Sequence, residues 1–179
     1  SSCYHSHPGF PARIPLWLAC PHTHGSPTPV RRGNLRMLTL LSSSSKSWNL
    51  VERLLFPAPR PTYNIRSYPN ELIFIPRIDG ERVPCLFLPF KHARFLVIYF
   101  HANAEDLGLC YPFLQIFREQ FQVHVLAVEY PGYGVCTGAA SSESVLANAH
   151  AALRFVTEDL KLPLDQVKLF GRSIGTGPA

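Results

Sequence analysis

Two short, continuous hydrophobic runs stand out in the second half of the chain. They are FLVIYF at residues 95–100 and VHVLAV at residues 123–128. Runs of this kind are typical of strands that are buried on both faces, as in parallel sheets. Each run therefore predicts a strand, and residues 166–170 (QVKLF) are expected to form a third.

An antiparallel hairpin is expected before these strands. Residues 71–77 (ELIFIPR) and residues 82–88 (RVPCLFL) each predict a strand, and Asp79-Gly80 between them is a strong turn signal. Proline cannot donate a hydrogen bond to a neighbouring strand, so Pro84 predicts an edge position for the second strand of the hairpin.

Helices are expected in the two segments that separate the buried strands. Residues 106–121 predict a helix in which one face carries Leu109, Phe113, Ile116 and Phe117. A second, longer helix is expected to begin at a cap formed by Ser141 or Ser142, with Glu143 in its first turn. Its buried stripe is predicted at Leu146, Ala149, Leu153, Val156 and Leu160. The predicted fold class is α/β: an antiparallel hairpin followed by a mostly parallel sheet with flanking helices.

The charge of the chain is concentrated near its beginning. The net charge is +5, and residues 1–51 contain no acidic residue, whereas the basic and acidic residues that follow are equal in number. The basic residues of that first part are Arg13, Arg31, Arg32, Arg36 and Lys46. Since no basic stripe is interleaved with aromatic residues, we predict no nucleic-acid partner.

The composition divides the chain into a tail and a domain. Residues 1–60 are expected to be tail and linker, and residues 61–179 a partial domain. Within the tail, the proline-rich residues 1–36 predict either disorder or a translated leader before Met37. The five cysteines form no CxxC pair and no metal-binding spacing, so we expect no metal, no cofactor and a reducing, cytoplasmic location. No stretch approaches the roughly 18 apolar residues that a membrane span needs.

The candidate chemistry lies in residues 171–175, which read G-R-S-I-G directly after the last predicted strand. This is the G-x-S-x-G pattern of a nucleophile elbow, in which a sharp turn exposes a serine at the end of a sheet. Gly171 and Gly175 have no Cβ, and we expect this to let the strand and the helix pack closely around Ser173. A chance match is the alternative, and a nucleotide-binding loop at residues 175–177 is another, although it lacks the lysine of a P-loop.

Two further loops are expected beside the elbow, because sites in such sheets form beyond the carboxyl ends of the strands. They are residues 101–106 (HANAED) and residues 129–134 (EYPGYG). Acyl transfer needs a nucleophile and backbone N–H groups aimed at the developing oxyanion. The candidates are Ser173 as the nucleophile, the N–H of Ile174 as one donor, and the N–H of Asn103 or Ala102 as the other.

The segments LLFPAPRPTY, YFHANAEDLG, EYPGYG and FGRSIGTGPA occur in this order along the chain. Together they resemble the α/β-hydrolase superfamily, and within it the small α/β-hydrolase-domain proteins that include protein depalmitoylases. The resemblance implies the N-terminal part of an α/β-hydrolase fold and serine-hydrolase activity on acyl esters or thioesters. The implied partner is an acylated small molecule or a lipidated protein, which would place the protein in the cytoplasm or at the periphery of a membrane. Ala102 stands where the family loop has glycine, which predicts an altered oxyanion loop.

The base that would activate Ser173 is not evident. In this fold the acid and the histidine follow the serine, and residues 174–179 contain neither. His101 is expected to be structural, and His92, His124 and His150 are not expected to reach Ser173. We therefore expect the chain to be the truncated N-terminal part of a hydrolase and inactive by itself; the alternative is a non-catalytic truncated isoform or gene-model fragment.

Overall fold

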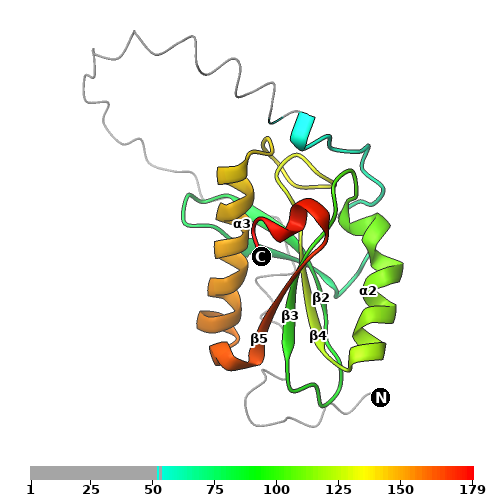
Figure 1. Ribbon diagram of the computed structural model, residues 1–179, viewed down its shortest axis with the longest axis vertical. Helices are drawn as coiled ribbons and strands as arrows, with labels where there is room; N and C mark the ends of the chain where they lie inside the picture. Colours follow the sequence, from blue (N-terminus) through cyan, green and yellow to red (C-terminus); the bar gives the residue numbers. More distant parts are fainter. Residues whose placement is uncertain (1–51, 53) are drawn as a thin grey trace, which may run out of the picture.

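The computed structural model describes residue 52 and residues 54–179, which form a five-stranded sheet flanked by helices (Figure 1). The strands are β1 (Leu72–Pro76), β2 (Arg82–Leu88), β3 (Leu96–Phe100), β4 (His124–Val128) and β5 (Val167–Gly171). The helices are α2 (Leu107–Phe121), α3 (Ser142–Arg154), the π-helical turn η2 (Phe155–Asp159) and the 3₁₀ turns η3 (Leu164–Gln166) and η4 (Ser173–Thr176). The prediction of disorder or a translated leader for residues 1–36 concerns residues that lie outside the described part of the chain.

The sheet confirms the predicted mixture of antiparallel and parallel pairing. Its strand order is β1-β2-β4-β3-β5. The hairpin strands β1 and β2 are antiparallel, as are β2 and β4, whereas β3 runs parallel to both β4 and β5. The carboxyl ends of β3, β4 and β5 therefore meet at one edge of the sheet, and the loops that follow them lie together there.

The edge position predicted from Pro84 is wrong, because β2 lies between β1 and β4. The Pro84 carbonyl accepts a hydrogen bond from the Glu129 N–H, at 3.0 Å, so the polar groups of Pro84 point toward β4. The paired register of β2 with β4 begins one residue later, at Cys85 opposite Val128. Pro84 thus lies within the β1–β2 register, opposite Phe74, and at the end of the β2–β4 register.

Each face of the sheet carries its own hydrophobic core. On one face α3 and η2 pack against the sheet, with Phe155 and Val156 buried, and on the other face α2 does so, with Leu107 and Leu114 buried (Figure 1). All residues of β3 and of β4 are buried, as the continuous runs predict.

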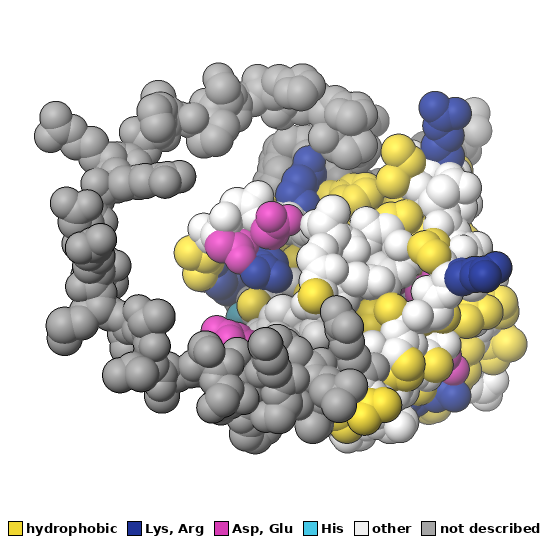
Figure 2. All heavy atoms as spheres, turned by 90° about the horizontal axis from the view of Figure 1, so that it is seen from above, with side chains coloured by type: hydrophobic (Ala, Val, Ile, Leu, Met, Phe, Trp, Pro, Cys, Tyr) yellow, Lys and Arg dark blue, Asp and Glu magenta, His cyan; other side chains and the backbone are white. Residues whose placement is uncertain are grey.

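The buried face of α2 differs from the predicted one. Its buried residues are Leu107, Cys110, Leu114 and Phe117. Of the predicted face only Phe117 is buried, while the other three are partly or largely exposed: Leu109 at 52%, Phe113 at 37% and Ile116 at 66%. The helix is hydrophobic on most of its circumference, so periodicity alone is compatible with more than one buried face. Figure 2 shows hydrophobic side chains on the side of the molecule where α2 lies.

The long helix begins as predicted. Ser141 caps α3 by accepting a hydrogen bond from the Ser144 N–H, and the Ser144 hydroxyl oxygen accepts in turn from the Ser141 N–H. Of the predicted stripe, Ala149, Val156 and Leu160 are buried, but Leu146 is 45% exposed, so that part of the prediction is wrong. Among the described residues, no helix is long and apolar enough to cross a membrane.

Candidate active site

Ser173 lies at a sharp turn between β5 and η4, at the sheet edge where β3 and β4 also end. Its φ of +51° falls in the left-handed region, which a serine rarely adopts. The side chain is exposed. Backbone strain of this kind persists only where the surrounding structure enforces it, and it is common at functional sites.

The two glycines of the motif lie where no side chain fits. A Cβ on Gly171 would overlap the backbone of Gly175, and a Cβ on Gly175 would overlap the Phe100 carbonyl oxygen and lie 2.8 Å from the His101 carbonyl oxygen. The Arg172 N–H also donates to the Phe100 carbonyl, at 3.0 Å. The turn therefore sits directly against the end of β3, and glycine is required for this close approach.

The loop after β3 is held by the side chain of Asn103. The Asn103 Nδ2 donates to the Leu55 carbonyl at 2.8 Å, and its Oδ1 accepts from the Ala104 N–H at 3.0 Å and from the Tyr133 hydroxyl at 3.2 Å. The non-glycine residue with positive φ in this loop is Ala104, at +56°, and not Ala102. Alanine at position 102 therefore causes no left-handed strain in this loop.

A buried ion pair lies beneath this loop. The His101 Nε2 is 2.9 Å from the Glu129 Oε1, and both side chains are fully buried. Glu129 also accepts hydrogen bonds from the Tyr63 hydroxyl at 2.9 Å and from the N–H groups of Leu107 and Tyr130, each at 3.1 Å. The pair thus joins the loops after β3 and β4 and the start of α2 to the segment at residues 54–63, here called the entry segment.

The sequence did not point to Glu129 as the partner of His101. The available signal was an acidic residue placed directly at the end of a fully hydrophobic strand, where an isolated charge would be costly. Two tyrosines of the same loop complete the network: the Tyr130 hydroxyl donates to the His101 carbonyl at 2.8 Å, and Tyr133 binds Asn103. Burial raises the pKa of Tyr133 to about 12 and that of Tyr130 further, so both hydroxyls remain protonated donors.

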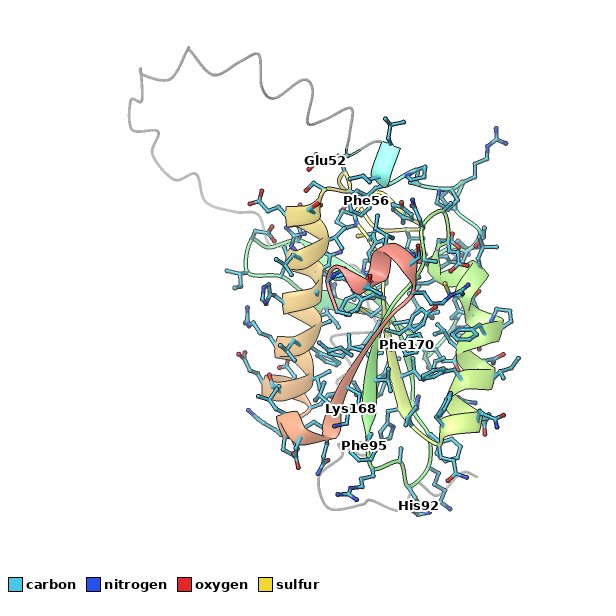
Figure 3. All side chains as sticks on the ribbon, in the orientation of Figure 1. Glu52, Phe56, His92, Phe95, Lys168 and Phe170 are labelled. Atoms are coloured by element: carbon cyan, nitrogen blue, oxygen red, sulfur yellow. The ribbon has the colours of Figure 1, made fainter. Side chains whose placement is uncertain are left out.

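The other histidines lie away from Ser173. His124 is buried in β4, where burial lowers its pKa to about 4, and its Nδ1 accepts a hydrogen bond from the Phe90 N–H at 3.2 Å. His92 lies at the opposite end of the molecule from η4 (Figure 3), and His150 is exposed on α3. Within the described part of the chain, no histidine forms a hydrogen bond with Ser173.

Arg172, within the motif itself, points toward α2. Its guanidinium lies 3.4 Å from the Glu105 carboxylate and 5.5 Å from the centre of the Phe113 ring. These contacts hold the residue before Ser173 against the loop that leads into α2. The two sides of the site, the elbow and the loop after β3, are therefore linked by side chains as well as by backbone.

Two curated proteins are similar to this chain in sequence. The α/β hydrolase domain-containing protein aho-3 of Caenorhabditis elegans is 28% identical over 154 residues, which are 73% of this chain and 46% of the relative. The human α/β hydrolase domain-containing protein 17B is 27% identical over 101 residues, 56% of this chain and 35% of the relative. The chain spans less than half the length of either relative. No protein-family model matches it.

Solved structures share the fold at low sequence identity. An esterase of Pyrococcus furiosus superimposes with a TM-score of 0.52 and 14% identity, covering 68% of this chain and 51% of the esterase. The thermostable carboxylesterase EstE1, cloned from a metagenomic library, gives 0.50 and 20%, covering 79% and 49%. The shared architecture is the mixed sheet with flanking helices, and the described residues correspond to about half of each neighbour.

Proposed function

We propose that the chain is part of an α/β-hydrolase, like the α/β hydrolase domain-containing proteins that it resembles, and that Ser173 is the nucleophile of a serine hydrolase acting on acyl esters or thioesters. The observation that carries the proposal is the strained, exposed serine, φ +51°, held by two obligatory glycines at the carboxyl edge of the sheet. A structural serine gains nothing from such a position, whereas a nucleophile must project toward its substrate.

The proposed reaction is acyl transfer through Ser173. Its Oγ attacks the carbonyl carbon, and the negative charge on the carbonyl oxygen is stabilised by backbone N–H groups. We assign these donors to Ile174 and to Asn103 or Ala102. The oxygen or sulfur leaving group departs with a proton, and water then hydrolyses the acyl-enzyme. No described histidine forms a hydrogen bond with Ser173, so the proposal assigns the nucleophile and the donors but not the base.

The proposed substrate carries an apolar acyl group, on a small molecule or on a lipidated protein. Leu54 and Leu55 expose 71% and 46% of their surface. The backbone of Leu55 is bound by Asn103, so these side chains lie next to the proposed oxyanion loop. Exposed leucines beside the proposed oxyanion loop favour an apolar substrate over a charged one.

Labelling with a fluorophosphonate probe tests the nucleophile. A chain extended to the length of the curated relatives should be labelled at Ser173, its Ser173→Ala variant should not, and the kcat of that variant for a short acyl ester should be lower by roughly a thousandfold or more. Ser142→Ala, which removes another exposed serine hydroxyl, should leave the labelling and the kcat unchanged. Absence of labelling, or equal labelling of Ser173→Ala, would instead favour a non-catalytic product. Comparison of matched octanoyl esters and thioesters then separates the two substrate classes.

A further inference from the structure

Both ring nitrogens of His101 face hydrogen-bond acceptors. The Nδ1 lies 2.9 Å from the Ala102 carbonyl oxygen, and the Nε2 lies 2.9 Å from the Glu129 Oε1. A carbonyl oxygen can only accept, so the Nδ1 must carry a proton. The ring also lies against Tyr130, with 3.8 Å between the ring centres, which leaves it little freedom to turn.

The second nitrogen lies against Glu129. The carboxyl group of Glu129 accepts from three donors besides His101, namely Tyr63, Leu107 and Tyr130. The His101 ring is therefore held from two sides, at Nδ1 by the Ala102 carbonyl and at Nε2 by Glu129.

The contact at Nδ1 fixes the orientation of a whole peptide group. The Ala102 carbonyl and the Asn103 N–H belong to one planar, trans peptide, so they point in opposite directions. Because His101 holds the carbonyl toward its buried ring, the Asn103 N–H points away from the ring. The preceding carbonyl, that of His101, is held separately by the Tyr130 hydroxyl at 2.8 Å.

We propose that His101 is a positioning residue: its ring, held in place by Glu129, fixes the Ala102–Asn103 peptide with the Asn103 N–H available to the oxyanion. The inference rests on the proposed function, in which that N–H is the donor from the loop after β3. It also selects Asn103 over Ala102 as the source of that donor.

Two variants of His101 separate positioning from mere structural support. The side-chain nitrogen of asparagine occupies nearly the place of Nδ1, and that of glutamine nearly the place of Nε2. His101→Asn therefore keeps the hydrogen bond to the Ala102 carbonyl and loses Glu129, whereas His101→Gln does the reverse. The measurements are kcat and KM for a short acyl ester, the urea midpoint of unfolding, and hydrogen exchange of the Asn103 amide, all on the full protein.

Positioning predicts opposite orders for activity and stability. His101→Gln should lose about 100-fold in kcat with little change in KM, because an oxyanion donor acts mainly in the transition state. Its Asn103 exchange rate should change by about tenfold or more. His101→Asn should keep kcat within about tenfold although it unfolds at lower urea, since Glu129 loses a buried hydrogen-bond partner.

A purely structural role predicts that the less stable variant is also the less active one. The inference would be overturned if His101→Asn had the lower kcat of the two variants and if the exchange rate of the Asn103 amide were unchanged in His101→Gln. Failure of the proposed function has a different signature, which is the absence of Ser173-dependent turnover in the parent protein. Asn103 exchange in the two variants still decides the orientation of the peptide in that case. Equal exchange rates of the Asn103 amide in the two variants would show that His101 does not fix the Ala102–Asn103 peptide.

Discussion

Gly175 is the residue at which the elbow touches the rest of the sheet. A Cβ there would overlap the Phe100 carbonyl oxygen and lie 2.8 Å from that of His101, and both are backbone atoms at the end of a central strand. We predict that Gly175→Ala lowers the free energy of unfolding by about 1–3 kcal/mol, because the turn must move away from β3. The same movement displaces Ser173, so labelling by a fluorophosphonate should fall as well.

Gly177→Ala is the matched control in the same turn. A Cβ at Gly177 would lie 3.3 Å from the Ile174 carbonyl oxygen, and its φ of −66° suits any residue. Urea unfolding should therefore show a change of less than about 0.5 kcal/mol. An equal loss in the two variants would mean that the close approach to β3 does not govern the turn.

The spacing of the motif was enough to predict which residues lack room for a side chain, because a G-x-S-x-G turn has one dominant geometry. It was not enough to predict the pairing of His101 with Glu129. These residues are 28 positions apart and belong to different loops, and only the parallel arrangement of β3 and β4 brings them together. A contact that depends on the order of the strands, such as this one, can be identified only once the fold is known.

At the scale of an element, α2 shows how burial is decided by the sheet and not by the helix alone. Leu114 is fully buried between α2 and the sheet, whereas Ile116 is 66% exposed. We predict that Leu114→Ala lowers the free energy of unfolding by about 3 kcal/mol, through lost burial and the cavity that remains. Urea denaturation of the variant measures the loss.

Ile116→Ala provides the contrast on the same helix. It removes a mostly exposed side chain and introduces the residue with the highest helix propensity, so we expect a change of less than about 0.5 kcal/mol in either direction. The periodicity of the sequence favoured the opposite result, since it placed Ile116 on the buried face. A larger loss for Ile116→Ala would show that the described surface of α2 is covered in solution.

Strands were easier to predict than helix faces in this chain. In β3 and β4 both faces are buried, so a continuous hydrophobic run has one interpretation. Around α2 the hydrophobic residues form more than one possible stripe, and the choice among them follows from where β2 and β4 lie. The edge position predicted from Pro84 was wrong for a related reason. The strand that contains it, β2, is central, and its register with β4 begins at Cys85, one residue after Pro84.

At the scale of the whole molecule, the entry segment joins the two cores across the edge of the sheet that carries the site. Phe56 packs against the core on the α3 side, and Tyr63 belongs to the core on the α2 side. Figure 3 shows Phe56 above η4, at the end of the molecule opposite His92. Thr62 is tied by its N–H and hydroxyl to the Asp106 carboxylate, which also caps α2.

The Tyr63 hydroxyl is the link between the entry segment and the buried pair, so its removal should affect the entire fold. Tyr63→Phe keeps the packed ring but leaves the Glu129 Oε2 with one donor fewer in a fully buried site. We predict a loss of about 2 kcal/mol in the free energy of unfolding, as expected for a buried hydrogen bond to a charged acceptor. Tyr111→Phe removes a similar bond, 2.6 Å long, from the partly buried Glu71, and should cost less than about 1 kcal/mol because water can replace the hydroxyl. Equal losses in the two variants would show that Glu129 does not depend on the entry segment, and that the site edge is stabilised by the sheet alone.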